Sequence, residues 1–226
     1  SMFVGTSNAK IADKPCHCDR GTYNDTLTNS CPPCPRGRYQ DESGYILTEC
    51  TKKCSAGKYS DQQRTVSNDD CKSCSPGKWS NEEGLTLDSQ CIKCVGGKYS
   101  TTGPGQTSES ACNNFCSPGK WSNEEGLSSD CNSCPKGKYS TSGKGQTSIT
   151  VCNNSCSAGR YSTESGLTSN DQCTACSKGQ YSMEVGADDE NVCKICRAGQ
   201  YVENTGNSQC KLCKPGRYLS INQNDN

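Results

Sequence analysis

The fold is decided by the segment Cys131-Asn-Ser-Cys-Pro-Lys-Gly-Lys-Tyr-Ser140, which combines a pair of cysteines, a glycine and an aromatic ring. Its central pattern, Cys-x-x-Gly-x-aromatic, occurs eleven times at intervals of 16 to 22 residues. A short period maintained along a chain is the signature of a repeat architecture. We therefore expect about eleven modules of roughly twenty residues each, marked by the aromatic residues Tyr23, Tyr39, Tyr59, Trp79, Tyr99, Trp121, Tyr139, Tyr161, Tyr181, Tyr201 and Tyr218.

The composition indicates that these modules are held together covalently. The chain has 22 cysteines among 226 residues, whereas Leu, Ile, Val and Phe together make up only about a tenth of it. So little apolar surface cannot offset the entropy of ordering the backbone. The single histidine and the lack of any catalytic constellation predict that the chain is not an enzyme and binds no cofactor.

The segments between the cysteines predict hairpins rather than helices. They are rich in the turn formers Ser, Thr, Asn, Asp and Gly and show no 3.6-residue apolar period. We expect a small disulfide-rich repeat protein: an elongated, solenoid-like array of stapled β-hairpin modules with little or no helix, each contacting only its sequence neighbours. Residues 1–15 are expected to be a cloning scar and linker, residues 16–218 the repeats, and residues 219–226 the tail of a truncated longer array.

The cysteines fall into eleven close clusters, which favour structural disulfides over zinc. The spacing within a cluster varies from one to three residues, and His17 is the sole histidine, so zinc ligation is a remote alternative. One pairing joins the second cysteine of each cluster to the first of the next; its main rival pairs first to first and second to second. The former leaves Cys16 and Cys213 free and predicts the pairs Cys18-Cys31, Cys34-Cys50, Cys54-Cys71, Cys74-Cys91, Cys94-Cys112, Cys116-Cys131, Cys134-Cys152, Cys156-Cys173, Cys176-Cys193 and Cys196-Cys210.

Three repeated features are candidate functional sites. The glycine before each ring is expected to allow a positive φ or a close backbone approach. The ring is expected to pack on a disulfide or a neighbouring module, although it could also dock a sugar or a protein. Asn24 and Asn153 lie in glycosylation sequons within polar segments, where we expect a glycan to project into solvent. The residues between glycine and ring form a basic ladder, which is either a solvated edge or a binding site for an acidic glycan: Arg38, Lys58, Lys78, Lys98, Lys120, Lys138, Arg160 and Arg217.

The motifs resemble a known family. Strings such as Cys54-Ser-Ala-Gly-Lys-Tyr-Ser, Cys134-Pro-Lys-Gly-Lys-Tyr-Ser and Cys156-Ser-Ala-Gly-Arg-Tyr-Ser, each followed by a glycine and a cysteine cluster, resemble the ephrin-receptor-like cysteine-rich repeat. A looser similarity extends to the cysteine-rich modules of tumour necrosis factor receptors. The resemblance implies an extracellular, elongated, disulfide-stapled scaffold used for adhesion, spacing or protein binding, and it transfers no ligand-binding residue.

Two main functional hypotheses follow, with a zinc-binding intracellular scaffold as a remote third. The first is a secreted or cell-surface spacer or adhesion scaffold, and the second is a receptor ectodomain that binds a protein or an acidic glycan on its basic, aromatic face. Partners are expected to be proteins or glycans at a cell surface or matrix, or further copies of the chain. Lys and Arg balance Asp and Glu, 24 against 24, which argues against nucleic acid as a partner. The apolar runs are far shorter than the roughly 20 residues of a membrane span, so no membrane insertion is expected.

Overall fold

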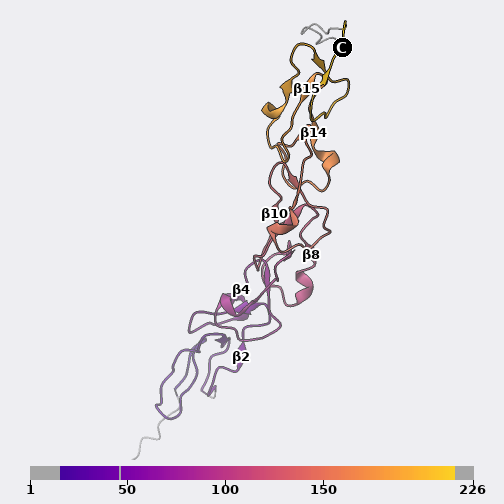
Figure 1. The fold of residues 1–226 in the computed structure, drawn as a ribbon. Coiled ribbons are helices and arrows are strands. Elements are labelled where there is room, and N and C mark those ends of the chain that lie inside the picture. The colour runs from indigo at the N-terminus through magenta and orange to yellow at the C-terminus, as the bar shows by residue number, and fades with distance from the viewer. Residues whose placement is uncertain (1–15, 46, 217–226) are drawn as a thin grey trace, which may run out of the picture. The chain divides into compact units, whose positions relative to one another are not determined.

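The structure is a computed structural model that describes residues 16–45 and 47–216 (Figure 1). These residues divide into two compact units. Within the described ranges, the first unit comprises residues 16–45, 47–92 and 102–111, and the second comprises residues 93–101 and 112–216. The expected scar and linker, residues 1–15, and the expected tail, residues 219–226, lie outside the described residues.

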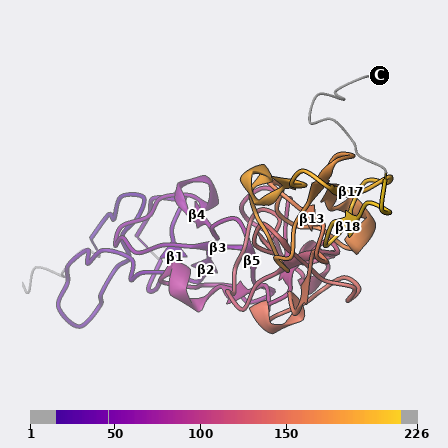
Figure 2. The ribbon, with the colours of Figure 1, turned by 45° about the horizontal axis from the view of Figure 1, so that its top comes forward.

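Each regular sheet in the described residues is a short antiparallel hairpin, and there are nine of them (Figures 1 and 2). The described chain contains no α-helix, only six 3-10 turns of three residues, as the hairpin prediction requires. The strands are β1 (Arg38–Tyr39), β2 (Lys52–Lys53), β3 (Lys58–Tyr59), β4 (Lys72–Ser73), β5 (Lys78–Trp79), β6 (Ile92–Lys93), β7 (Lys98–Tyr99), β8 (Asn114–Phe115), β9 (Lys120–Trp121), β10 (Asn132–Ser133), β11 (Lys138–Tyr139), β12 (Asn154–Ser155), β13 (Arg160–Tyr161), β14 (Thr174–Ala175), β15 (Gln180–Tyr181), β16 (Lys194–Ile195), β17 (Gln200–Tyr201) and β18 (Lys211–Leu212). The 3-10 turns are η1 (Asn68–Asp70), η2 (Asp88–Gln90), η3 (Glu109–Ala111), η4 (Ile149–Val151), η5 (Asn170–Gln172) and η6 (Glu190–Val192).

A disulfide closes each of the ten complete modules in the described residues. We number the modules 1 to 11 from their opening cysteines, Cys18, Cys34, Cys54, Cys74, Cys94, Cys116, Cys134, Cys156, Cys176, Cys196 and Cys213. The opening cysteine is bonded to the first cysteine of the next cluster in all ten, with Cα–Cα distances of 5.3 to 6.0 Å. The structure thus has the second-to-first pairing and not its rival.

The hairpin of module 7 shows how the local sequence forms a strand pair. The N–H of Lys138 donates to the carbonyl of Pro135 in a turn that contains Gly137, whose φ is 69°. The chain then runs as β11, and β12 returns beside it with Lys138 opposite Ser155 and Tyr139 opposite Asn154. Cys134 precedes β11 by four residues and Cys152 precedes β12 by two, so their disulfide helps to hold two strands that the two-residue ladder could not hold alone.

The core of each unit consists mainly of disulfides. Half-cystines make up most of the buried apolar side chains in the described residues. In the first unit, Tyr59 of module 3 packs against Cys74, Leu85 and Cys91 of module 4. In the second unit, Tyr139 packs in the same way on the Cys156–Cys173 disulfide and Leu167 of module 8. The ring therefore lies on the disulfide of the following module, one of the two packing positions that the sequence suggests.

Modules also contact the module two positions further along the chain. A Cβ atom placed on Gly37 of module 2 would lie 2.2 Å from the carbonyl oxygen of Gly84 in module 4. The same approach joins Gly119 of module 6 to Gly166 of module 8, where the distance would be 2.1 Å. The expectation that a module contacts only its sequence neighbours is therefore wrong. The physical reason is that a glycine at positive φ leaves room for a second backbone to pass directly over it.

Candidate functional site

The basic ladder occupies the first strand of successive hairpins. Arg38, Lys58, Lys78, Lys98, Lys120, Lys138 and Arg160 lie in β1, β3, β5, β7, β9, β11 and β13, respectively. Arg217 lies outside the described residues. These residues share the same backbone position in the first strand, as the sequence repeat predicts, but their side chains make different contacts.

Two of the ladder lysines form close ion pairs within their own modules. Nζ of Lys78 lies 2.5 Å from Oδ2 of Asp88, and Nζ of Lys120 lies 2.9 Å from Oδ2 of Asp130. Each acid follows its lysine by ten residues, near the end of the loop. The pairs are only partly exposed, with side-chain exposures of 18% and 26% for Lys78 and Asp88. These cations are thus partly neutralised by their own module.

Other ladder members bind carbonyl oxygens of their own modules. Nζ of Lys58 donates to the carbonyl oxygen of Asn68 at 3.0 Å. The Nη1 atoms of Arg38 and Arg160 donate to the carbonyl oxygens of Cys50 and Cys173 at 2.8 and 2.9 Å. These three cations therefore tie the first strand to the end of the loop.

Lys98 and Lys138 differ from the rest. Nζ of Lys98 lies 5.3 Å from the centroid of the Phe115 ring, a cation–π contact. Lys138 is exposed. Within the described part of the chain, Lys138 has the side chain most open to a ligand among the ladder positions.

The ion pairs set the charge state of their acids. Burial alone would raise the pKa of Asp88, but hydrogen bonds from Lys78 and Ser75 outweigh it and lower that pKa below the ordinary value of 3.8. The pKa of Asp130 is lowered by the corresponding bonds from Lys120, Cys131 and Ser117, again against the effect of burial. Both carboxylates therefore stabilise the fold in their ionised form.

We expect the Lys78→Gln variant to raise the pKa of Asp88 and to lower the free energy of unfolding at pH 7 by about 1 kcal/mol. Because the native pKa lies below the unfolded value, this stabilisation is present above pH about 4 and is lost as the pH falls through the native pKa. Carboxyl carbon NMR titration measures the change. Lys138→Gln is the matched control that should leave Asp88 unaltered; an unchanged Asp88 pKa in Lys78→Gln contradicts the assignment.

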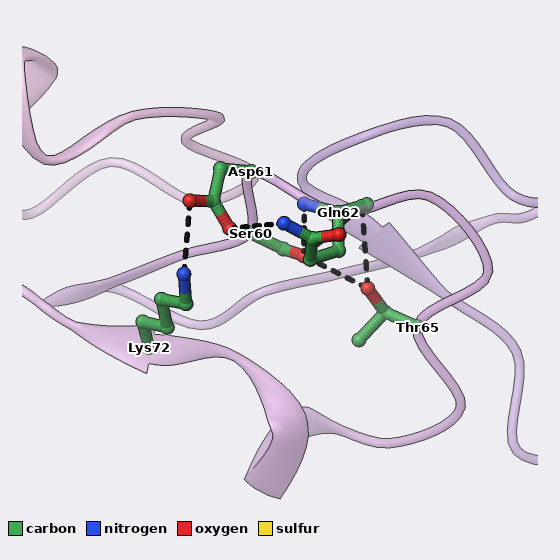
Figure 3. Close-up of polar contacts among 5 residues, drawn as sticks. All are labelled: Ser60, Asp61, Gln62, Thr65 and Lys72. Atoms are coloured by element: carbon green, nitrogen blue, oxygen red, sulfur yellow. Dashed lines mark hydrogen bonds and ion pairs between the residues drawn. The ribbon is translucent and has the colours of Figure 1, made fainter.

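In seven modules the residue after the ring is a buried serine, a polar position whose burial the sequence analysis missed. Ser60, Ser80, Ser100, Ser122, Ser140, Ser162 and Ser182 are at most 3% exposed. The hydroxyl groups of Ser60 and Thr65 form a hydrogen bond of 2.8 Å, and the N–H of Gln62 donates to Oγ of Ser60 at 3.4 Å (Figure 3). Beside it, Lys72 of β4 donates to Oδ2 of Asp61 at 2.9 Å. The recurrence of serine after the ring was the available signal for these buried positions.

The buried serines also link successive modules through their backbones. The N–H of Ser60 donates to the carbonyl of Leu85, and the N–H of Ser140 donates to that of Leu167. Ser60 and Ser140 therefore each follow a ring that packs on the next module, and each donates a backbone hydrogen bond to that same module. In module 3, the ring Tyr59, the buried Ser60 and the ladder cation Lys58 are all engaged in contacts within the array.

The two glycosylation sequons differ in exposure. Asn153 is exposed, as expected. Asn24 is 2% exposed, and its Nδ2 donates to the carbonyl of Tyr45 at 2.7 Å. The expectation that a glycan on Asn24 would project into solvent is wrong, because Asn24 occupies the buried position after the ring Tyr23.

Comparison with known families identifies part of the array. Residues 21–71 match the family model described as tyrosine-protein kinase ephrin type A/B receptor-like. No curated protein matches the chain. Among the described residues, none of the helices has the length and apolar composition that a membrane span needs. Disulfide density and the family match suggest an extracellular module.

The same disulfide-closed module that forms the matched segment recurs through module 10. The resemblance stated from the sequence is thus confirmed: residues 21–71 match the ephrin-receptor-like family, and the described chain as a whole is similar to an array of its cysteine-rich repeats.

Proposed function

We propose that the chain is a non-enzymatic extracellular spacer or adhesion scaffold, whose partners are proteins or glycans at a cell surface or matrix. The observation that carries this proposal is the internal use of the repeated side chains. Rings such as Tyr59 and Tyr139 cover disulfides, and ladder cations such as Lys78 and Lys120 bind acids of their own modules. A receptor would concentrate binding energy in a few exposed anchors instead.

The pattern of contacts supports a linear spacer. The hydrogen bonds and backbone bridges of the described residues join modules no more than two positions apart. Such an arrangement resembles solenoids, in which each repeat contributes length and a local interface. Length is then the quantity on which function depends.

We expect that deleting residues 75–116 shortens this spacer without unfolding it. The deletion joins Cys74 to Ser117 and keeps the cysteine alternation. Gly105, which lies opposite Gly57, is then replaced by Gly145. Gly105 and Gly145 each precede a glutamine in a Gly-x-Gly-Gln loop. Energy transfer between fluorophores on non-natural residues at positions 49 and 208 should report a separation shorter by about a quarter, since the labels lie in modules 2 and 10 and two of the eight module steps between them are lost.

The number of free thiols checks that the deletion variant has oxidised normally; it should remain two, Cys16 and Cys213. An unchanged separation in an oxidised variant contradicts the spacer. The receptor alternative is tested on the same proteins with a sulfated polysaccharide as the probe. Salt-dependent binding that is abolished by Lys138→Glu would favour the receptor, because Lys138 is the exposed ladder position among the described residues.

A further inference from the structure

The disulfides create a second covalent route along the chain. Each one closes a loop whose ends are 13 to 18 residues apart, and the next loop begins only three or four residues later. A path from Cys18 to Cys210 can therefore pass through ten disulfides and nine short linkers without entering any loop. The linkers are residues 32–33, 51–53, 72–73, 92–93, 113–115, 132–133, 153–155, 174–175 and 194–195.

Linkers and loops differ in structure. Eight of the nine linkers contain the second strand of a hairpin, from β2 to β16, and are hydrogen-bonded to the first strand. The remaining linker holds Pro33, which is bridged to Thr22. The loops carry the exposed turns. The residues at which a cut would sever the chain are thus strand-paired and flanked by disulfide-bonded cysteines.

The glutamates are likewise found in the loops and not in the linkers. All eleven glutamates of the sequence lie in disulfide-closed loops and are exposed: Glu42, Glu49, Glu82, Glu83, Glu109, Glu124, Glu125, Glu164, Glu184, Glu190 and Glu203. No linker contains a glutamate or an aspartate. A glutamate-specific endopeptidase can therefore cut the loops of this chain but has no cleavage site in any linker.

We propose that this chain is a protease-tolerant tether, in which continuity and tension are carried by the disulfide-and-linker path rather than by the loops. An endopeptidase that hydrolyses a peptide bond in a loop adds one water and creates two new ends, which the disulfide keeps joined. The biological use of this property rests on the proposed spacer function, but the property itself depends only on the disulfide connectivity.

The same path limits how far the chain can stretch. Fully extended, the linkers span about 110 Å and the ten disulfides add about 60 Å, giving a limit near 160 to 170 Å between Cys18 and Cys210. The same chain after reduction would extend to about 670 Å. Pulling experiments should therefore show a contour length about fourfold shorter before reduction than after it.

The decisive experiment is digestion with a glutamate-specific endopeptidase, under denaturing conditions that leave the disulfides intact. Seven of the ten loops contain glutamate. We expect one covalent product by mass spectrometry, lacking only the short pieces between two glutamates of one loop. Subsequent reduction should release separate fragments. Separation into fragments before reduction would overturn the proposal.

A matched pair of variants calibrates this digestion. Thr174→Glu places a glutamate in the linker between Cys173 and Cys176, and cleavage there should split the unreduced chain in two. Thr141→Glu places one in the loop of module 7, which has none, and should leave the unreduced product joined. Both threonines are exposed. If Thr174→Glu is cut and the product stays joined, the connectivity is not the one described. A receptor without spacer function would still pass this test, so the two proposals fail separately.

Discussion

The Gly119→Ala variant is expected to lose about 3 kcal/mol or more of unfolding free energy, because two independent penalties coincide at that position. Gly119 has a φ of +77°, where an L-residue costs about 1 to 2 kcal/mol. The new Cβ would also lie 2.1 Å from the carbonyl oxygen of Gly166, a backbone atom that cannot rotate away. Denaturant unfolding with the disulfides intact, followed by tryptophan fluorescence, measures the loss.

Two further glycines separate these penalties. Gly179 has a φ of +75°, and a Cβ added there would have nothing within 4 Å, so Gly179→Ala should cost only the conformational part, about 1 to 2 kcal/mol. Gly143 has open space and no positive φ, so Gly143→Ala should change stability by about 0.5 kcal/mol or less. Equal losses in Gly119→Ala and Gly179→Ala would show that the contact between modules 6 and 8 contributes nothing.

The contact between alternate modules was not predictable from the sequence, although the glycine itself was. A glycine next to a turn predicts positive φ or close approach, and Gly119 shows both. Its partner, however, is another glycine 47 residues away, which has no side chain to leave a pattern. The one trace of a two-module unit in the sequence is that the block Cys74–Leu85 recurs, identical in sequence, at Cys116–Leu127, about 40 residues later. Hairpins and disulfides, by contrast, depend on local spacing and could be predicted directly.

The ladder shows a second limit of sequence reasoning. Periodicity places Lys78 and Lys120 on equivalent strands, but it does not show which way a flexible side chain turns. The acids that bind them, Asp88 and Asp130, each follow by ten residues, so the pairs were present in the sequence as a spacing. Without a known loop geometry, that spacing could equally belong to two solvated charges.

Removing the disulfide of module 7 is expected to cost about 3 kcal/mol, since it closes a loop of 18 residues. The variant for this test is Cys134→Ala with Cys152→Ala, because both cysteines are buried and alanine leaves no unpaired thiol or hydroxyl. Cys213→Ala is the matched control. Cys213 is free, so its replacement should leave stability unchanged.

The extent of the damage in that double variant distinguishes a linear array from a single cooperative core. Tyr139 of module 7 packs on module 8. The backbone of Gly137 closely approaches that of Gly186 in module 9, since a Cβ atom on Gly137 would lie 2.2 Å from the Gly186 carbonyl oxygen. Hydrogen exchange should therefore quicken in module 7 and in modules up to two positions away, while amides in modules 2 and 3 keep their protection. Uniform loss of protection along the chain would contradict local coupling. Complete reduction should remove protection everywhere, because no module retains enough apolar burial to stay folded without its disulfide.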